Sequence, residues 1–394
     1  MRLPRNVFVL GIASFLTDVS TEMAYVVLPM FLTITLGAPI AYVGLVEGVA
    51  ETVASFGKMF SGWFSDKLRA RKMIVVSGYA LSGLTRPLLA IATAPWHVLG
   101  ARFVDRIGKG LRTSPRDALI ADSSEEGTKG KMFGFHRAMD HGGAISGSLV
   151  AFALLSSGIS NYRTIFWVAV IPAAFTVAVL LLGVREIRPA STTAVGSILK
   201  LDLREMNPIF RKYLVVVFLF TLGNSSDAFL ILRAKAAGLR DSQIPLLWAA
   251  LHVCKVLSVI PFGALSDRMS RRTLILTGWI FYSAIYFGFA FVAGAPAVCA
   301  LFIVYGLFYG LTEGPERAWV ADLVPQERLG RAYGIYNFAI SIGALPASLI
   351  MGILWQKVSM GSAFFFGAVL ALIAAAALLL FVKADHKDAE SSGS

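Results

Sequence analysis

Two carboxylates lie four residues apart inside an apolar stretch near the start of the chain. Asp18 and Glu22 share one face of a predicted helix, and Thr17, Ser20 and Thr21 keep that level of the helix polar. A charge in hydrocarbon is costly unless it faces water or a partner, so acids at this depth predict a functional interior site. Such acids can bind and release protons; a permanent ion pair that serves only packing is the alternative.

A stripe of basic side chains follows in the fourth apolar stretch. Arg102, Asp105, Arg106, Lys109 and Arg112 recur every three or four residues and so lie on one helical face. Lipid would not tolerate this stripe, which therefore faces the protein interior or water. Arg102 and Arg106 lie at about the depth of the two acids and are their predicted partners. Lys109 and Arg112, deeper toward the loop, belong to the same site or anchor the loop.

The fifth stretch carries His136 and Asp140 one turn apart. Histidine titrates most easily near neutral pH, so this spacing favours a His–Asp proton relay. An ion pair of Asp140 with Arg112 and a plain interior polar cluster are the alternatives. Met132 on the same face adds a weaker hypothesis of a soft-metal site.

Polar residues recur at corresponding depth in the second half of the chain. Asn224 and Asp227 interrupt the seventh apolar stretch, together with two serines between them. Glu313 precedes a Gly-Pro pair in the tenth. These residues are predicted to line an interior cavity.

Signatures of other function classes are missing from the sequence. It contains no HExxH, GxSxG or phosphate-binding P-loop motif, and no cluster with metal-ligand spacing. We therefore predict neither an enzyme nor a nucleotide-driven pump, and no cofactor or resident metal. The two cysteines, Cys254 and Cys299, fall in separate predicted helices and are expected to be free thiols.

The composition indicates an all-α integral membrane protein. Of 394 residues, 56% are hydrophobic and 15% are charged, and the mean hydropathy is +0.70. Apolar segments of about 20 residues, the length that crosses a bilayer as helix, recur along the chain. About twelve spans are predicted, near 6–34, 40–64, 73–92, 96–121, 132–156, 163–184, 212–236, 243–266, 272–292, 296–321, 330–354 and 360–382.

The net charge of +12 is a topology signal and not a sign of nucleic-acid binding. The bases gather in alternate loops, whereas the opposite turns hold almost none; Arg163, Arg240 and Lys357 are the exceptions. Lysine and arginine accumulate on the cytoplasmic side, so both termini are predicted to be cytoplasmic, in the inner (cytoplasmic) membrane of the cell. The first apolar run ends without a small-residue cleavage site and contains two acids, so it is predicted to be a span and not a leader.

The chain repeats itself at about half its length. Gly62-Trp-Phe-Ser-Asp66-Lys67 returns as Gly263-Ala-Leu-Ser-Asp267-Arg268, and the segment Pro115–Asp122 returns as Pro315–Asp322. This repeat predicts two six-span halves joined by a polar segment that is either an interfacial helix or a flexible linker. The predicted parts are an N-terminal bundle 1–184, a cytoplasmic linker 185–211, a C-terminal bundle 212–382 and a disordered tail 383–394.

The repeated motif places acids beside bases where a span meets the cytoplasm. We predict that Arg71 bridges Asp66 and Asp122, and that Arg271 bridges Asp267 and Asp322. Pairs of this kind form and break when two repeats alternate access to a central site; topological anchoring is the alternative. The predicted cytoplasmic gate comprises Gly62, Asp66, Lys67, Arg71, Asp122, Gly263, Asp267, Arg268, Arg271 and Asp322.

The loop pattern G-x-x-x-D-[RK]-x-x-x-[RK]-[RK] after span 2, with its copy after span 8, resembles the major facilitator superfamily, and is similar to its bacterial and archaeal efflux members. The segment Arg102–Gly110 resembles the family's R-x-x-x-G-x-G-x-G element, with Arg106 at the first glycine. Gly143-x-x-x-Gly147 resembles the antiporter signature, with Ser148 in place of proline. The glycines around it also suit close helix packing.

The resemblance implies two pseudo-symmetric six-helix bundles whose first helices line a central cavity. It also implies that Arg102 tunes the affinity of the span-1 acid for protons. The expected function is proton-coupled export of a drug-like compound or metabolite by rocker-switch alternation. An importer or facilitator of an organic anion or zwitterion is the alternative, and divalent metal efflux a weaker one. The expected partners are a small molecule, protons and the bilayer, with no nucleic acid, and the protein is expected to be a monomer.

Overall fold

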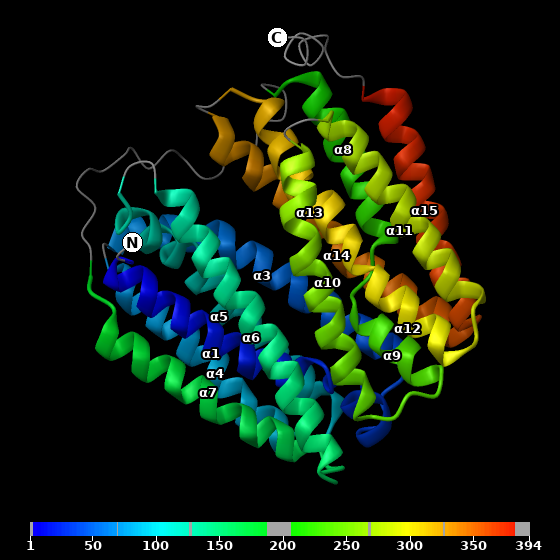
Figure 1. Ribbon diagram of the computed structural model, residues 1–394, viewed down its shortest axis with the longest axis horizontal. Helices are drawn as coiled ribbons and strands as arrows, with labels where there is room; N and C mark the ends of the chain where they lie inside the picture. Colours follow the sequence, from blue (N-terminus) through cyan, green and yellow to red (C-terminus); the bar gives the residue numbers. More distant parts are fainter. Residues whose placement is uncertain are drawn as a thin grey trace. The chain divides into compact units, whose positions relative to one another are not determined.

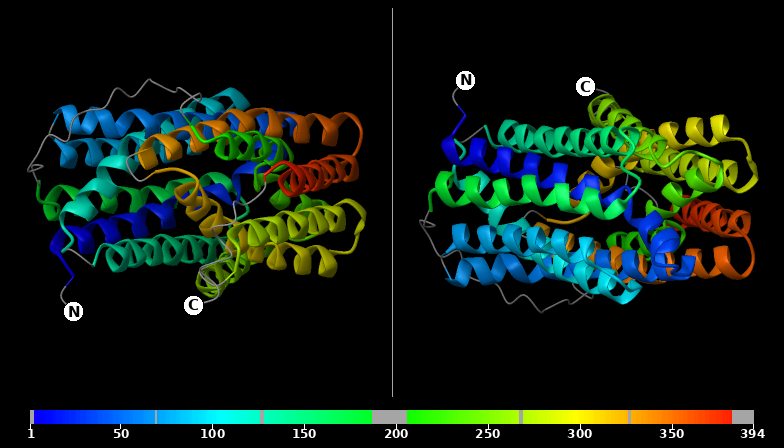
Figure 2. Two further views of the ribbon diagram at one scale, coloured as in Figure 1. Left: turned by 90° about the horizontal axis from the view of Figure 1, so that it is seen from above. Right: turned by 90° about the horizontal axis from the view of Figure 1, so that it is seen from below.

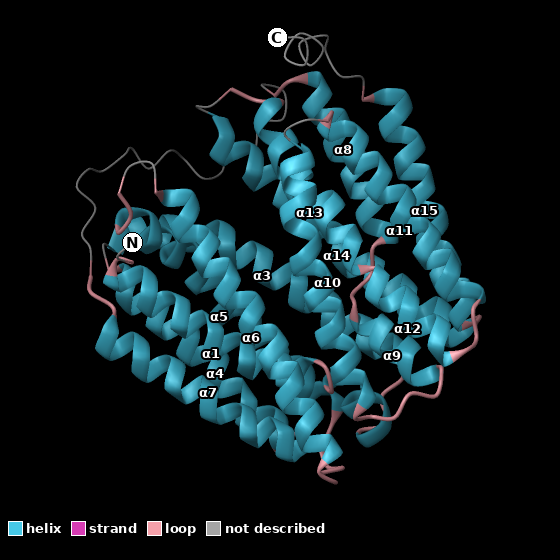
Figure 3. Ribbon diagram, viewed as in Figure 1, coloured by secondary structure: helices cyan, strands magenta, loops and turns pink. Residues whose placement is uncertain are grey.

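The computed structural model of the chain describes residues 3–68, 70–125, 128–186, 206–266, 269–325 and 328–382, without the side chains of 59, 60, 62–68, 260 and 264. Within these ranges all regular structure is helical (Figure 3), as the sequence predicts. Most of the predicted linker (187–205), whether an interfacial helix or a flexible segment, and the predicted tail 383–394 lie outside the described residues.

The chain divides into two compact units. Unit 1 comprises residues 1–38, 49–199 and 240–249, and unit 2 comprises 39–48, 200–239 and 250–394. Each unit therefore includes a short segment from the other half of the sequence. These segments are the first parts of two long helices, α3 (Ile40–Leu68) and α10 (Gln243–Ser266).

Unit 1 is built around α1 (Arg5–Tyr25), which packs against α6 (Lys129–Ser156) and α7 (Tyr162–Gly183). The helix α4 (Arg71–Ala90) packs against α5 (Pro95–Asp122) and α7. Figures 1 and 2 show α6, α1 and α7 side by side along their lengths. A core of small and branched apolar residues from these helices, such as Leu10, Val75 and Leu119, is fully buried.

Unit 2 repeats these helix pairings one for one. The helix α8 (Pro208–Gly223) packs against α14 (Leu329–Lys357) and α15 (Met360–Phe381), and α11 (Arg271–Phe291) packs against α13 (Gly306–Asp322) and α15. The short helices α9 (Ala228–Ala236) and α12 (Ala295–Val304) complete the unit. The predicted internal repeat is thus present in the packing as well as in the loops.

The same glycine seams hold the helices together in both units. A Cβ added to Gly110 of α5 would lie 2.6 Å from Gly57 of α3, and one added to Gly310 would lie 2.7 Å from Ser258. Small residues at these points let the backbones approach closely, as in other membrane helix pairs.

Eleven helical stretches of the described chain are long and apolar enough to span a membrane. The predicted fourth span, α5, is 28 residues long but is not among them. Its charged stripe lowers its hydropathy, although many of these charges, including Arg102, Asp105 and Arg106, are buried.

Three predicted spans are interrupted and not continuous helices. After α1 ends at Tyr25, the chain continues through α2 (Leu28–Met30) and a π-helix η1 (Phe31–Thr35). The seventh span breaks between α8 and α9, because Asn, Ser and Asp side chains compete for backbone groups and disfavour helix interiors. The tenth bends at Tyr305, between α12 and α13. Irregular backbone at membrane depth is tolerated where protein or a cavity surrounds it.

Candidate functional site

The predicted span-1 acids lie next to a packing seam in unit 1. Gly143 and Gly147 of α6 face the α1 backbone, where an added Cβ would lie 2.4 Å from the carbonyl oxygens of Phe15 and Val19. These contacts flank Asp18, which confirms that the two glycines permit close packing. The α1–α6 seam therefore fixes the position of Asp18 against the polar residues of α6.

Asp18 is half-buried among other acids. Asp140 and Glu22 act on it electrostatically as like charges, and Lys109 and Arg112 act as opposite ones. Ser14 Oγ donates a short hydrogen bond to Asp140 Oδ1, which ties the α6 acid to α1 one turn before Asp18. Among the described residues, the Asp18 carboxylate has no hydrogen bond or ion pair. The structure thus brings Asp18, Glu22 and Asp140 together.

Glu22 has a partner that the sequence did not predict. The indole N–H of Trp248 donates a 2.9 Å hydrogen bond to its carboxylate, and the Trp248 ring lies 5.5 Å from that of Tyr25. Trp248 is buried and belongs to the segment 240–249 that folds with unit 1. Because the two residues are more than 200 positions apart, no local pattern could have paired them.

The predicted pairing of Arg102 with a span-1 acid is not formed. Over the described part of the chain, no ion pair links Arg102 to Asp18 or Glu22; instead its guanidinium lies 3.6 Å from Asp105 and 5.4 Å from the Tyr25 ring centre. Arg106 lies 3.9 Å from Asp105 and 3.7 Å from Glu51 of α3. Asp105 lies three residues further along the same helix, on the same face, and is therefore within ion-pair distance of Arg102. Arg102 and Arg106 still act electrostatically on Glu22.

Arg86, in the middle of α4, is a buried residue that is not among the predicted site residues. Its guanidinium donates to Ser20 Oγ at 3.1 Å, to Thr21 Oγ1 at 2.9 Å and to Thr85 Oγ1 at 3.1 Å. It also lies 3.5 Å from Asp105 Oδ1. Arg86 therefore joins α1, at the turn between the two acids, to α5. The polar residues Ser20 and Thr21 of α1, which needed a donor inside the membrane, were the signal from which this role of Arg86 could have been predicted.

His136 and Asp140 face each other on α6, with Nδ1 of the histidine 3.5 Å from Oδ2 of the aspartate. His136 is buried, and its Nε2 has no hydrogen-bond partner among the described residues. Arg112 does not pair with Asp140: it donates to Ser82 at 2.9 Å and stacks on Tyr79. Met132 packs in the hydrophobic core of unit 1, as a structural methionine would. The described residues contain no group of three His, Cys, Asp or Glu side chains suited to a metal.

Unit 2 has its own polar centre at the break between α8 and α9. Asp227 accepts hydrogen bonds from Tyr305 at 3.2 Å and, at a shorter distance, from Tyr309. Lys255 of α10 lies 3.8 Å from Glu313 of α13. Asn224 caps the end of α8 with a non-helical backbone, φ −98° and ψ 85°. Asp227 and Glu313 thus belong to one neighbourhood, but the sequence alone did not identify the two tyrosines or the lysine as their partners.

The structure forms one ion pair of each of the two bridges predicted for the cytoplasmic gate. Arg71 pairs with Asp122 and Arg271 pairs with Asp322, each at the start of one helix and the end of another. Arg271 also donates to the Ala318 carbonyl at 2.9 Å. Gly263 has open space where a Cβ would stand, so packing does not require a glycine there. The gate side chains of Asp66, Lys67, Asp267 and Arg268 lie outside the described residues, as does any side-chain context of Gly62.

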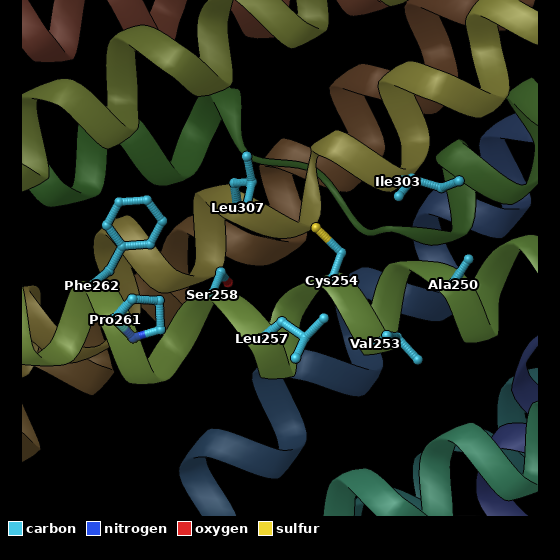
Figure 4. A pocket seen from close by; sticks show the side chains of 9 residues that line it. All are labelled: Ala250, Val253, Cys254, Leu257, Ser258, Pro261, Phe262, Ile303 and Leu307. Carbon is cyan, nitrogen blue, oxygen red and sulfur yellow. The ribbon is translucent and has the colours of Figure 1, made fainter.

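An apolar cavity of about 630 Å³ lies in unit 2. Figure 4 shows Cys254 and Ser258 of α10 facing it, with Leu307 of α13 opposite. Ser258 already bonds the Gly306 carbonyl, at 3.2 Å. Because no charged side chain lines it, this cavity offers apolar contacts to a solute and does not recognise charge.

Three comparisons identify what the chain resembles. The sequence model of the Major Facilitator Superfamily matches residues 10–251 and again 213–394. An uncharacterized MFS-type transporter of Methanocaldococcus jannaschii is 33% identical over 386 residues, covering 96% of this chain and 95% of the relative. The multidrug resistance protein MdtH of Photorhabdus laumondii is 31% identical over 120 residues, 30% of each chain. The crystal structure of a point mutant of the nucleoside transporter NupG superimposes with a TM-score of 0.83 over 96% of this chain and 100% of its own, at 14% identity.

Proposed function

Because the chain belongs to the Major Facilitator Superfamily and is a multi-pass membrane transporter, we propose that it exports a small solute in exchange for protons. The proposed mechanism is alternating access, in which two repeats rock about a central site. The proposed halves are 1–184 and 212–382, in a monomer in the inner membrane with both termini cytoplasmic.

The observation that carries proton coupling is the surroundings of Asp18. Its carboxylate is half-buried near two other acids, and among the described residues it forms no direct contact with a basic side chain. Like charges at close range cannot all stay ionised at low cost, so a proton shared among Asp18, Glu22 and Asp140 relieves the repulsion. His136, buried one turn from Asp140, extends this group toward the start of α6 and completes the proposed proton path.

The hydrogen bond from Trp248 gives Glu22 a second task. An indole N–H donates to a carboxylate more strongly than to a neutral acid, because bonds to ionised groups are the stronger ones. Loss of the charge on Glu22 therefore loosens its hold on the first part of α10. Proton binding at Glu22 would in this way be linked to a change in helix contacts.

The basic loops are proposed to act as the cytoplasmic gate. Arg71–Asp122 and Arg271–Asp322 would persist in one transport state and break in the other, with Asp66, Lys67, Asp267 and Arg268 completing each cluster. Export as the direction is supported by the partial similarity to a multidrug resistance protein.

One observation favours a second candidate, import of an organic anion. Three guanidinium groups, those of Arg86, Arg102 and Arg106, surround the single carboxylate of Asp105. Guanidinium groups recognise carboxylates and phosphates through paired hydrogen bonds. In that case the span-1 acids would serve as fixed partners of the basic stripe, and transport would not depend on a proton gradient.

Everted membrane vesicles with an acidified interior decide between these functions. The proposal predicts gradient-driven accumulation of a solute from a panel of amines, nucleosides and organic acids, and its loss in Asp18→Asn. Counterflow without a gradient should persist in that variant, because it needs binding and alternation but no net proton transfer. Asp117→Asn, which changes a more exposed acid of α5 paired with its neighbour Arg116, is the matched control. Gradient-driven accumulation that survives Asp18→Asn would refute proton coupling through this residue.

A further inference from the structure

Glu316 of α13 is a half-buried acid that neither the predicted site nor the proposed proton path includes. It joins α13 to α11 and α14. The indole N–H of Trp279 donates a 2.9 Å hydrogen bond to its Oε1, and the hydroxyl of Tyr336 donates a 2.6 Å hydrogen bond to its Oε2. All three residues belong to unit 2. Each oxygen of the carboxyl group therefore has one partner, and both partners are neutral.

The charged groups near Glu316 do not pair with it. Glu313 and Arg317, on its own helix, act on it electrostatically as a like and an opposite charge. Over the described part of the chain, no ion pair links Glu316 to Arg317 or to another base, and Arg317 is exposed. The titratable groups that face Glu316 from α8 and α14 are the phenols of Tyr213 and Tyr336, whereas α11 contributes the indole. Inside a membrane, an acid without a basic partner is costly to keep charged.

The two hydrogen-bond partners suit both charge states of Glu316. An indole N–H only donates, so Oε1 is an acceptor whether or not the carboxyl group carries a proton. A phenol can donate or accept. A proton on Oε2 can therefore be donated to the Tyr336 hydroxyl, which then directs its own hydrogen to Tyr213, whose hydroxyl interacts with it. Glu316 keeps both hydrogen bonds in either charge state.

The corresponding place in unit 1 also holds a titratable group. The positions 200 residues before Glu316 and Tyr336 are Arg116 and His136. Arg116 acts electrostatically on His136, which belongs to the proton path proposed for unit 1. The helices that carry these residues pair in the same way in both units. The repeated packing thus brings a titratable side chain to the same contact between helices twice.

We infer that Glu316 is a second proton-binding site, in which the Tyr336 hydroxyl reverses its hydrogen bond when the proton binds. The proton adds to Oε2 of the carboxylate, and no other covalent bond changes. The inference goes beyond the proposed function, which assigns protons to unit 1 alone. Asp322 follows Glu316 by six residues on α13, about 9 Å along the helix axis. The site therefore lies near the ion pair of Arg271 with Asp322, toward the side proposed to be cytoplasmic.

Infrared difference spectroscopy of the full chain in lipid membranes tests this site without a solute or a gradient. A carboxyl group that takes up a proton between mildly alkaline and mildly acidic pH gains a carbonyl band that the carboxylate lacks. The wild-type difference spectrum should contain one such band that is lost in Glu316→Gln. Asp117→Asn, which changes an acid of α5 paired with Arg116, is the control and should keep the wild-type bands.

Two further variants report on the two hydrogen bonds. Trp279→Phe removes the donor to Oε1, so the Glu316 band should move to higher frequency, because a carbonyl group that accepts no hydrogen bond has a stiffer double bond. A tyrosine signal should accompany the band in the wild type and be lost in Tyr336→Phe, because this hydroxyl changes from donor to acceptor. A permanently ionised Glu316 that only joins the helices would produce neither effect.

A difference spectrum from which Glu316→Gln removes no band would overturn the inference, as would a band that Trp279→Phe does not move. If Glu316→Gln does not fold, Trp279→Phe and Tyr336→Phe still decide, since each keeps the acid. Failure of the proposed function is distinguishable. Gradient-driven accumulation that survives Asp18→Asn removes coupling through Asp18 and leaves the Glu316 band, whereas absence of that band leaves the proton path of unit 1.

Discussion

The polar centre of unit 1, around Asp18 and Glu22, and that of unit 2, around Asp227, lie among equivalent helices but differ in their chemistry. Positions 200 residues apart correspond, as Arg71 and Arg271 do in their ion pairs. By this correspondence Arg86, Asp105 and Lys109 of unit 1 become Tyr286, Tyr305 and Tyr309 of unit 2. A network of charges has been replaced, position by position, by a network of phenol groups.

This difference distinguishes the residues that the helix packing requires from those that the function requires. The helix pairings are the same in both units and several glycine contacts recur; for example Gly78 faces Arg112, and Gly278 faces Thr312. The helix pairings therefore stay the same although the polar side chains between the helices differ. Unit 1 therefore carries a fixed charge network beside the acids that are proposed to bind protons, and unit 2 carries neutral hydroxyls around one acid.

The largest effect is expected where the charge network is broken. Arg86→Met leaves Ser20, Thr21 and Asp105 without their shared donor, which should lower the free energy of unfolding by about 3 kcal/mol. Tyr286→Phe, at the corresponding position, removes one neutral hydroxyl and should cost about 1 kcal/mol or less. Unfolding in mixed micelles of sodium dodecyl sulfate measures both. Equal losses would show that the two networks are equally structural.

An intermediate effect is expected at the α1–α6 seam. Gly147→Ala would place a Cβ 2.4 Å from the Val19 carbonyl oxygen, which neither backbone can avoid without moving. Overpacking of this kind should cost about 1 to 3 kcal/mol, and the shift of α1 should also impair transport through Asp18. Position 347 of unit 2 is already an alanine, so that seam is looser.

Gly134→Ala is the control for the α1–α6 seam, because its Cβ would meet nothing within 4 Å. The same stability assay, with gradient-driven uptake, separates the variants. A fully stable and active Gly147→Ala would mean that the seam yields freely, and the claim that packing positions Asp18 would fail.

The smallest effect on stability is expected at the gate ion pairs. The side chain of Arg71 is 9% exposed and that of Arg271 is 28% exposed, so the first pair is less screened by water. Asp122→Asn should cost about 1 kcal/mol and Asp322→Asn less, as is usual for solvated pairs. If the two ion pairs form the gate, Asp122→Asn and Asp322→Asn should change the transport rate clearly while changing the free energy of unfolding little.

The charge exchange that combines Arg271→Asp with Asp322→Arg tests the gate directly. It keeps the pair and reverses its direction, so transport should return toward the wild-type rate while each single variant stays slow. Equal stability and equal rates for all of these variants would leave anchoring as the role of the loops.

Several features could be predicted from the sequence because their signals are local or repeated. Span positions follow from apolar length, and the pairing of Arg71 with Asp122 follows from a motif that occurs twice. The seam at Gly143 and Gly147 was also predictable, since small residues four apart on a membrane helix have few other uses.

Other features depend on distant partners and could not be predicted. Glu22 meets Trp248 only because a segment of α10 folds with unit 1, and no spacing rule connects them. Arg102 was expected to meet a span-1 acid, but Asp105 on its own helix is nearer. The break at Asn224–Asp227 was visible as poor helix formers, yet the tyrosines near it come from α11, from α13 and from position 305 just before α13.

The bond between Trp248 and Glu22 makes the protein its own optical reporter. Indole emission depends on the charge and polarity next to the ring, and here the neighbour is one of the acids proposed to carry protons. The difference between the pH-dependent emission of wild type and of Trp248→Phe would isolate this one chromophore from the other six tryptophans. Protonation of Glu22 could then be followed by tryptophan fluorescence, without a label and without a known solute.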